Sequence, residues 1–153
     1  MKKRIFIVCL VALMTVTFLA PAAQAAYTPD EVFSSVEVLD NGVTIETTLV
    51  IHGSIDILRS TSSKTATKTD VYKYNGTEIA TISLTANFGY DGSSSWVNSS
   101  SVSKSIASGW TYSGENLSSS GGTATVTASL KKFLITTVGV NTSITCSPTG
   151  AIS

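Results

Sequence analysis

Residues able to perform nucleophilic chemistry are scarce in this sequence. His52 is the only histidine, and Cys146 is the only cysteine after the first 25 residues. A cysteine nucleophile needs a base that takes its proton and a group that orients the base, and His52 lies in a different sequence segment. We therefore interpret His52 as a surface residue at a strand end and Cys146 as an apolar core thiol. The alternative for Cys146 is an intermolecular crosslink, since it has no second cysteine to pair with in the remaining chain.

The acidic residues form no recognisable catalytic or metal-binding set. Paired carboxylates can hydrolyse glycosides, but Asp40 and Asp91 directly precede turn sequences, where aspartate is a common residue. The sequence also has no Asp-x-Asp-x-Asp calcium loop, no His/Cys cluster typical of zinc and no glycine-rich phosphate loop. We therefore predict a protein that is not an enzyme and that binds no cofactor or metal.

Aromatic side chains are the remaining group with value in recognition. Trp96, Trp110 and Tyr112 are the candidates for ligand contact, because their flat faces suit sugar rings. Trp96 lies in a serine-rich stretch and is expected to be the most exposed of the three. The favoured interpretation is that they pack in the core, which is the commoner use of tryptophan in a β-sandwich.

The first 25 residues have the three parts of a secretory signal peptide. Lys2, Lys3 and Arg4 are followed by the apolar run Ile5–Ala20 and by the small-x-small sequence Ala23-Gln24-Ala25. The apolar run is shorter than the roughly 20 residues that cross a bilayer as a helix. We expect cleavage before Ala26, which leaves a single domain without a membrane segment.

Charge divides the remaining chain into two parts. Without the signal peptide, seven basic and ten acidic residues remain; residues 26–58 hold six acids and no base, and residues 59–153 hold seven bases and four acids. This field is too weak for nucleic-acid binding, and it suggests that the acidic part lies against the basic part. We interpret residues 26–58 as an acidic N-terminal segment, either a first hairpin or a removable pro-segment, and residues 59–153 as the β domain.

Apolar residues alternate with polar ones through most of the chain. Asn41-Gly42 and Asn75-Gly76 separate such runs and predict two-residue hairpin turns. The second turn sets a register with three cross-strand pairs: Tyr74 with Thr77, Lys73 with Glu78 and Tyr72 with Ile79. Further alternating runs start at Ile82, Ala124 and Val138. Short strands at regular spacing predict an antiparallel, immunoglobulin-like β-sandwich.

Three stretches depart from this strand pattern. Thr28-Pro29-Asp30-Glu31 resembles a helix start and predicts one or two turns through Phe33. The polar stretch from Gly53 to Asp70 is predicted to be a linker. The serine-rich stretch from Ser93 to Ser108 is predicted to be largely loop.

Residues 59–153 carry short motifs in a suggestive order. These are Ser63-Lys64-Thr65-Ala66-Thr67-Lys68-Thr69, Tyr74-Asn75-Gly76, Phe88-Gly89-Tyr90-Asp91-Gly92, Ser108-Gly109-Trp110, Gly122-Thr123-Ala124 and Thr145-Cys146-Ser147-Pro148-Thr149-Gly150. With them the chain resembles a group of small secreted proteins of Gram-positive, gut-associated bacteria that lack an assigned function. The resemblance implies a secreted β domain with a variable acidic leader and carries over no catalytic or binding residue. It also implies a second cysteine, and here Val97 stands at about that position.

The sequence therefore favours a secreted, non-catalytic module that binds an extracellular protein or glycan as a monomer or weak dimer. One alternative is a structural protein of the cell surface or wall, held by edge-strand pairing or by Cys146 crosslinks. Another is an exported effector or toxin, processed between Arg59 and Ser60.

Overall fold

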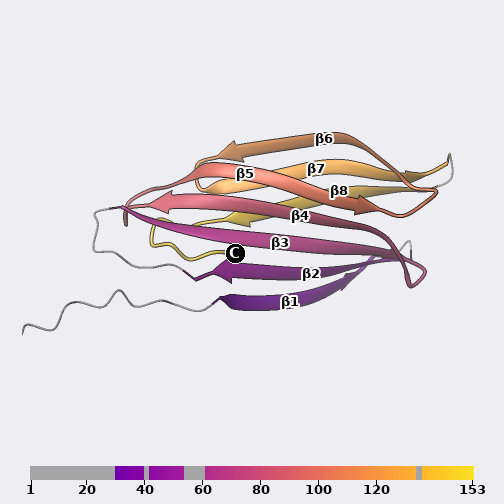
Figure 1. Cartoon of the computed structure of the whole chain (residues 1–153), viewed down its shortest axis with the longest axis horizontal. Helices are drawn as coiled ribbons and strands as arrows, with labels where there is room; N and C mark the ends of the chain where they lie inside the picture. Colours follow the sequence, from indigo (N-terminus) through magenta and orange to yellow (C-terminus); the bar gives the residue numbers. More distant parts are fainter. Residues whose placement is uncertain (1–29, 40–41, 54–60, 134–135) are drawn as a thin grey trace, which may run out of the picture.

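Eight β-strands make up most of the chain that the structure describes. The computed structural model describes residues 30–39, 42–53, 61–133 and 136–153 (Figure 1). The predicted signal peptide, the Asn41 turn position and the Arg59-Ser60 sequence lie outside these residues. The strands are β1 (Glu31–Val38), β2 (Val43–His52), β3 (Ser62–Tyr74), β4 (Thr77–Tyr90), β5 (Ser95–Ile106), β6 (Thr111–Ser120), β7 (Thr123–Lys132) and β8 (Thr136–Thr145). The described residues include no helix, and thus none long and apolar enough to cross a membrane.

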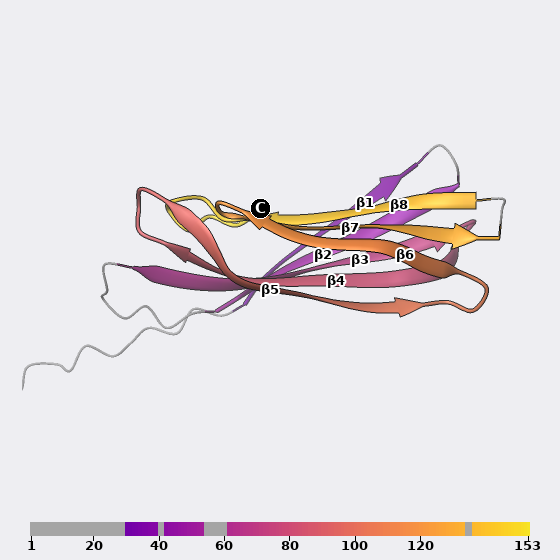
Figure 2. The same cartoon turned by 90° about the horizontal axis from the view of Figure 1, so that it is seen from above.

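The strands form two antiparallel sheets packed face to face. One sheet has the order β1-β2-β3-β4-β5 and the other the order β6-β7-β8, so each is a simple meander. Figure 2 shows β6, β7 and β8 as one layer over β3, β4 and β5. The prediction of an all-β, two-sheet protein is confirmed. The strand order differs from an immunoglobulin domain, which distributes consecutive strands over both sheets.

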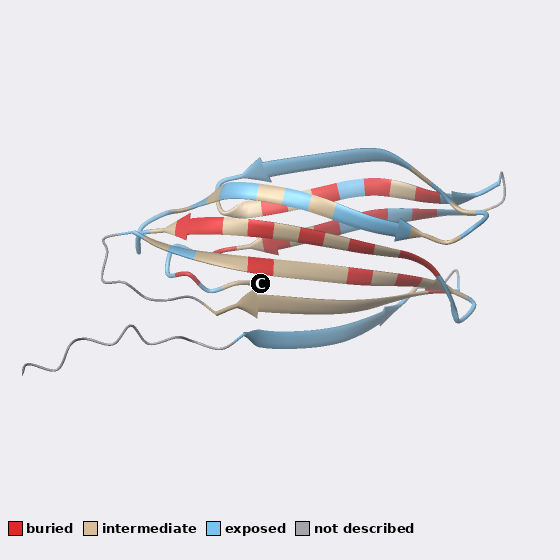
Figure 3. Ribbon diagram, viewed as in Figure 1, coloured by how far each residue is buried: buried red, intermediate tan, exposed pale blue. Residues whose placement is uncertain are grey.

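The core lies between the two layers. β4 follows the predicted alternation: Ile82, Leu84, Ala86 and Phe88 are buried, and the polar residues between them face outward. The opposite layer contributes alternate residues of β7 and β8, namely Ala124, Val126, Ala128, Leu130, Val138, Val140 and Ile144. Figure 3 shows the buried positions concentrated on β3, β4, β7 and β8. Removing this apolar surface from water is the main stabilising contribution to the fold.

Contacts between the sheets close both long sides of the sandwich. On one side Lys104 of β5 forms an ion pair with Glu115 of β6. On the other, Lys68 Nζ of β3 donates to the Ser143 carbonyl of β8 at 3.3 Å, and the Thr142 hydroxyl donates to Asp70. Strands β3 to β8 therefore form a unit that we call the closed sandwich. The β1–β2 hairpin continues the larger sheet beyond this unit, and we call it the wing.

The last residues of the chain close one end of the sandwich. We call residues 147–153 the C-terminal clasp. The Gly92 N–H donates to the Pro148 carbonyl at 2.9 Å, and Lys64 Nζ donates to the Gly150 carbonyl at 2.8 Å. Gly150 has a φ of +82°, and a Cβ there would lie 2.4 Å from the Tyr90 ring, so this position requires glycine. Three of the motifs that carry the resemblance, those of Lys64, Gly92 and Gly150, thus meet at this end.

Two stretches predicted to be irregular are strands. Ser62 to Asp70 belongs to β3, so the linker prediction is wrong there, and residues 54–60 lie outside the described residues. The serine-rich stretch forms β5, so the loop prediction is also wrong. In both cases hydroxyl side chains cover a solvent-facing sheet surface without charge. Thr67 with Thr85 at 3.0 Å is one such cross-strand hydroxyl pair.

Two local predictions within the larger sheet also need correction. Glu31 to Phe33 is extended rather than helical, because β1 forms eight consecutive pairs with β2 that outweigh a local capping signal. At the Asn75-Gly76 turn the first two predicted pairs are confirmed, but Tyr72 faces Ala80 instead of Ile79. A register shift beside Tyr72 allows both Ile79 and Ala80 to be buried.

Candidate functional site

The three aromatic residues considered as candidate ligand contacts do not form one surface. Trp96 lies at the start of β5, half-exposed against Gly89, and its Nε1 donates to Asn98 at 2.9 Å. Trp110 lies beyond the other end of β5 and packs edge-on to Tyr74, with ring centroids 5.8 Å apart. Tyr112 lies partly buried against the core, where burial raises its pKa to about 12 and Glu115 adds to the shift.

Cys146 lies in the core beneath the C-terminal clasp. Its side chain is buried, and burial raises the pKa of the thiol. The sulfur contacts the Ser147 carbonyl at 3.4 Å, and the Cys146 backbone pairs with Ile152. A disulfide to a second chain therefore requires the clasp to open first.

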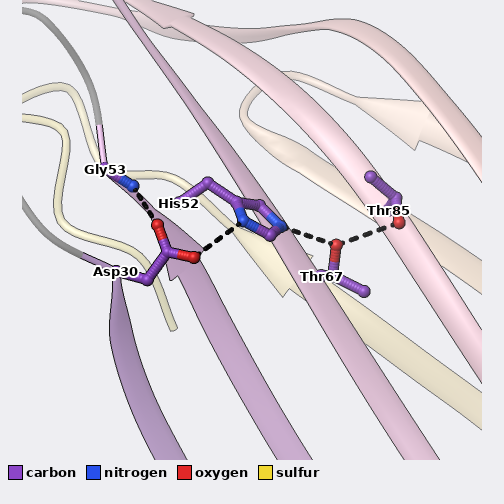
Figure 4. A network of polar contacts seen from close by, with 5 residues as sticks. All are labelled: Asp30, His52, Gly53, Thr67 and Thr85. Carbon is purple, nitrogen blue, oxygen red and sulfur yellow. Dashed lines mark hydrogen bonds and ion pairs between the residues drawn. The ribbon is translucent and has the colours of Figure 1, made fainter.

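Polar contacts connect His52 with Asp30, just before β1, with Thr67 of β3 and, through Thr67, with Thr85 of β4 (Figure 4). His52 Nδ1 lies 3.4 Å from Asp30 Oδ2, and Nε2 lies 3.1 Å from the Thr67 hydroxyl, which contacts Thr85 in turn. Asp30 Oδ1 accepts the Gly53 N–H at 2.7 Å. That hydrogen bond, together with His52, lowers the pKa of Asp30 despite some desolvation. We call Asp30, His52 and Gly53 the wing clamp, because they tie the start of β1 to the end of β2.

The order carboxylate, imidazole, hydroxyl is also that of a catalytic triad. Thr67, however, lies in the middle of β3 and pairs with Val50 on one side and Thr85 on the other. The backbone N–H groups around it are used in these ladders, so they are unavailable to stabilise an oxyanion. The arrangement suits a structural clamp better than acyl transfer.

Asp70 is a buried carboxylate that the linker prediction overlooked. It is 3% exposed and accepts hydrogen bonds from Thr47 of β2, at 2.6 Å, and from Thr142 of β8. Its charge adds to the effect of burial in raising the pKa of neighbouring Tyr72 to about 12. Asp70 therefore connects three strands at the boundary between wing and closed sandwich.

Among the described strands, the wing presents the large apolar side chains with the highest exposed fractions. Val32, Phe33, Val36 and Val38 are between 54% and 74% exposed, and every residue of β1 is exposed (Figure 3). Phe33 lies on the inner face of the sheet beside Leu49, and the three valines lie on the outer face. Both faces of β1 thus carry apolar surface that the second sheet does not cover.

No described strand pairs with the outer edge of β1, and this free edge presents unpaired backbone groups. The Leu39 N–H donates to the Val43 carbonyl at 2.8 Å, which makes Leu39 and Val43 a hydrogen-bonded pair in the register of the hairpin. Such pairs alternate along an antiparallel ladder, so Glu31, Phe33, Ser35 and Glu37 direct their N–H and C=O groups to β2. The groups that point away from the sheet belong to Val32, Ser34, Val36 and Val38.

The other three sheet edges are protected. β8 is capped by Lys68 and, at its end, by the C-terminal clasp. β6 has an irregular register between Ser113 and Asn116, and β5 has one near its start together with Lys104. Irregular registers and lysines are the devices by which proteins prevent edge pairing. β1 has neither a register shift nor a basic residue.

The charge of the wing is acidic, and part of it is neutralised. Glu46 of β2 accepts from Lys73 of β3 at 2.6 Å, which fulfils the expected contact between acidic and basic parts. Among the described residues, no basic side chain lies within 4.0 Å of Glu31 or Glu37. Both glutamates lie on the inner face of β1, on either side of Phe33.

Comparison with known proteins adds no relative. No protein family, no curated protein and no solved structure matches this chain. The described residues also hold no group of three or more potential metal-ligating side chains. The unprotected edge of β1 is therefore the feature from which we infer a function. The alternation of Val36 and Val38 predicted a strand here, but sequence alone gave no sign that it was an edge.

Proposed function

We propose that this protein is a secreted, non-catalytic interaction module that binds an extended segment of an extracellular partner along β1. The observation that carries the proposal is the free edge of the wing, where outward backbone groups lie beside exposed apolar side chains. The partner segment would add a sixth strand to the larger sheet, with backbone hydrogen bonds supplying affinity and alternate side chains supplying specificity. The signal-like residues 1–25 support an extracellular site of action.

A protein segment fits this surface better than a glycan does. Sugar recognition by stacking needs aromatic faces that lie together, and Trp96 and Trp110 lie at opposite ends of β5. The wing instead offers a backbone ladder, which an extended peptide complements directly.

Proline at an outward N–H tests strand addition without disturbing the hairpin. Val36→Pro removes a donor from the free edge, and proline is tolerated on edge strands at such positions. Peptides selected from a displayed random library on the unmodified protein should lose at least about 10-fold in affinity for this variant. Equal affinity for the variant and the unmodified protein would contradict the proposal.

The matched control lies on the other edge of the same sheet. The Ala107 N–H donates to the Ile79 carbonyl, so by the same alternation Ser100 of β5 has an outward N–H. Ser100→Pro should leave peptide affinity unchanged. A loss with Ser100→Pro and not with Val36→Pro would place the binding edge on β5.

The processed effector remains a distinct proposal with its own test. Removal of residues 26–58 would take away the wing and turn β3 into the sheet edge. The intact mass of the exported protein distinguishes the two proposals. An N-terminus at Ala26 supports a functional protein that retains the wing, and an N-terminus near Ser60 supports processing. Turnover of ester, peptide or glycoside substrates that is lost in His52→Ala would overturn the non-catalytic assignment.

A further inference from the structure

We propose that the segment bound by β1 is cationic, with basic residues at two positions six apart flanking an apolar residue. This inference rests on the proposed function and specifies the partner's chemistry. It follows from the position of Glu31, Phe33 and Glu37 on one face of the strand and from the hydrogen-bonding alternation of its free edge.

The inner face of β1 would make the closest side-chain contacts with an added strand. An antiparallel strand would form hydrogen-bonded pairs with Val32, Ser34, Val36 and Val38, whose backbone groups point outward. Glu31, Phe33, Ser35 and Glu37 would then stand in the non-hydrogen-bonded pairs, where the Cα atoms are only about 4.5 Å apart. The residues that face these four side chains therefore decide specificity.

Charge complementarity fixes the type of residue at two of these places. Glu31 and Glu37 have no basic neighbour within 4.0 Å among the described residues, and they are separated by about 20 Å of strand. Directly opposed charges of unlike sign stabilise a ladder, and those of like sign destabilise it. A lysine or arginine facing each glutamate would therefore complement the strand, and an apolar residue between them would cover Phe33.

A second copy of the chain is a poorer occupant of this edge. Two β1 strands would bring four uncompensated glutamates into one ladder. A two-fold register centred on Ser34 sets Glu31 directly opposite Glu37 of the second copy, and β1 supplies no basic residue to offset this. The same charges that repel a second copy attract a basic segment.

The probe is a peptide written for this register, Lys-Val-Thr-Thr-Leu-Val-Lys with blocked ends. Its first lysine faces Glu37, its leucine faces Phe33 and its last lysine faces Glu31. Two matched peptides replace both lysines by glutamine or by glutamate. Titration of the isotope-labelled protein, followed by its backbone amide resonances, should give at least about 10-fold tighter binding of the lysine peptide than of the glutamate peptide.

Two further measurements tie the preference to the named residues. In Glu31→Gln/Glu37→Gln the lysine and glutamate peptides should bind within about 2-fold of each other. In the unmodified protein, raising the salt from about 0.15 M to about 1 M should reduce the preference for lysine, since exposed charges are then screened. Loss of the preference in either case supports the register.

Other outcomes separate the two proposals. Equal binding of all three peptides, abolished by Val36→Pro, would overturn the cationic partner and leave strand addition standing. Failure of all three peptides to perturb β1 amides would contradict both. Concentration-dependent dimerisation with slowed exchange of the Ser34 and Val36 amides would make a second copy the occupant and overturn the inference.

Discussion

The two edge strands of the five-stranded sheet, β5 and β1, differ in how far they are protected against pairing with another strand. β5 is rich in serine, has an irregular register and carries Lys104, which forms an ion pair with β6. β1 is regular, has exposed apolar side chains on both faces and carries only acidic charge. One edge is built into the closed sandwich, and the other lies beyond it. The β5 edge shows that this sequence can protect a sheet edge against pairing with another strand. The β1 edge has no such protection.

The same contrast divides the molecule energetically. The closed sandwich has a two-sided core, whereas each face of β1 is open to water. Burial of apolar surface therefore stabilises β3 to β8 much more than it stabilises β1. Binding of a partner segment would cover surface that folding leaves exposed.

The largest expected difference lies between two phenylalanines of the same sheet. Phe88→Ala removes a fully buried ring from β4 and should lower the free energy of unfolding by about 3–5 kcal/mol. Phe33→Ala removes a ring that is 54% exposed on β1 and should cost less than about 1 kcal/mol. Chemical denaturation measures both values. Similar losses would show that Phe33 contributes to the core as much as Phe88 does.

A smaller effect is expected at the boundary between the two regions. Asp70→Ala leaves the Thr47 and Thr142 hydroxyls without their acceptor and should lower the free energy of unfolding by about 2–3 kcal/mol. Asp70→Asn keeps one oxygen acceptor and should cost about half as much. Denaturation curves of the two variants check this.

Valine substitutions of the two threonines sharpen the same comparison. Thr142→Val removes a fully buried hydroxyl in the closed sandwich, and Thr47→Val removes a partly buried one in the wing. We expect the larger loss of stability from Thr142→Val, because its contact with Asp70 joins the two sheets. A larger loss from Thr47→Val would mean that the wing anchors the sandwich.

A local effect of pH is expected at the wing clamp. Because the pKa of Asp30 is lowered, its contribution is fully present above the ordinary value for aspartate and is lost as the pH falls through the lowered value. The Gly53 amide, which donates to Asp30, should then exchange faster relative to amides of β4. Asp30→Ala should show this fast exchange already at neutral pH, and Asp30→Asn should retain part of the protection. Unchanged Gly53 exchange in Asp30→Ala would rule out the clamp.

The smallest effect is expected at the protected edge. Lys104→Met breaks an exposed ion pair between β5 and β6 and should lower the free energy of unfolding by less than about 0.5 kcal/mol. The same substitution removes a charge that discourages strand pairing at β5, so light scattering should show more association than in the unmodified protein. A loss above about 2 kcal/mol would show that the pair stabilises the closure of the sandwich.

Local patterns in the sequence predicted the parts of the fold that depend on neighbouring residues. The alternation around Leu84 predicted the inward face of β4, and Asn75-Gly76 predicted its hairpin. Strands β3 and β5 were missed because serine and threonine are typical both of loops and of exposed sheet faces. The register shift beside Tyr72 depends on packing against the second sheet, which no pattern within the hairpin reports.

The candidate site was harder to predict than the fold. A free edge is defined by which strands do not pair with it, and this depends on the order of all eight strands. The aromatic residues were candidates for ligand contact because of their residue type, whereas the exposed valines of β1 are ordinary strand residues. Asp70 was overlooked because its acceptor role depends on Thr142, which is distant in sequence.

The C-terminal clasp has a consequence for the order in which the protein folds. Both sheets are meanders, so most strands pair with a neighbour in sequence and can form hairpins as the chain emerges. Residues 147–153, however, contact Gly92 and Lys64, so that end of the sandwich closes through contacts between segments far apart in sequence. Such distant contacts form late, so we expect the hairpins to form first and this end of the sandwich to close last.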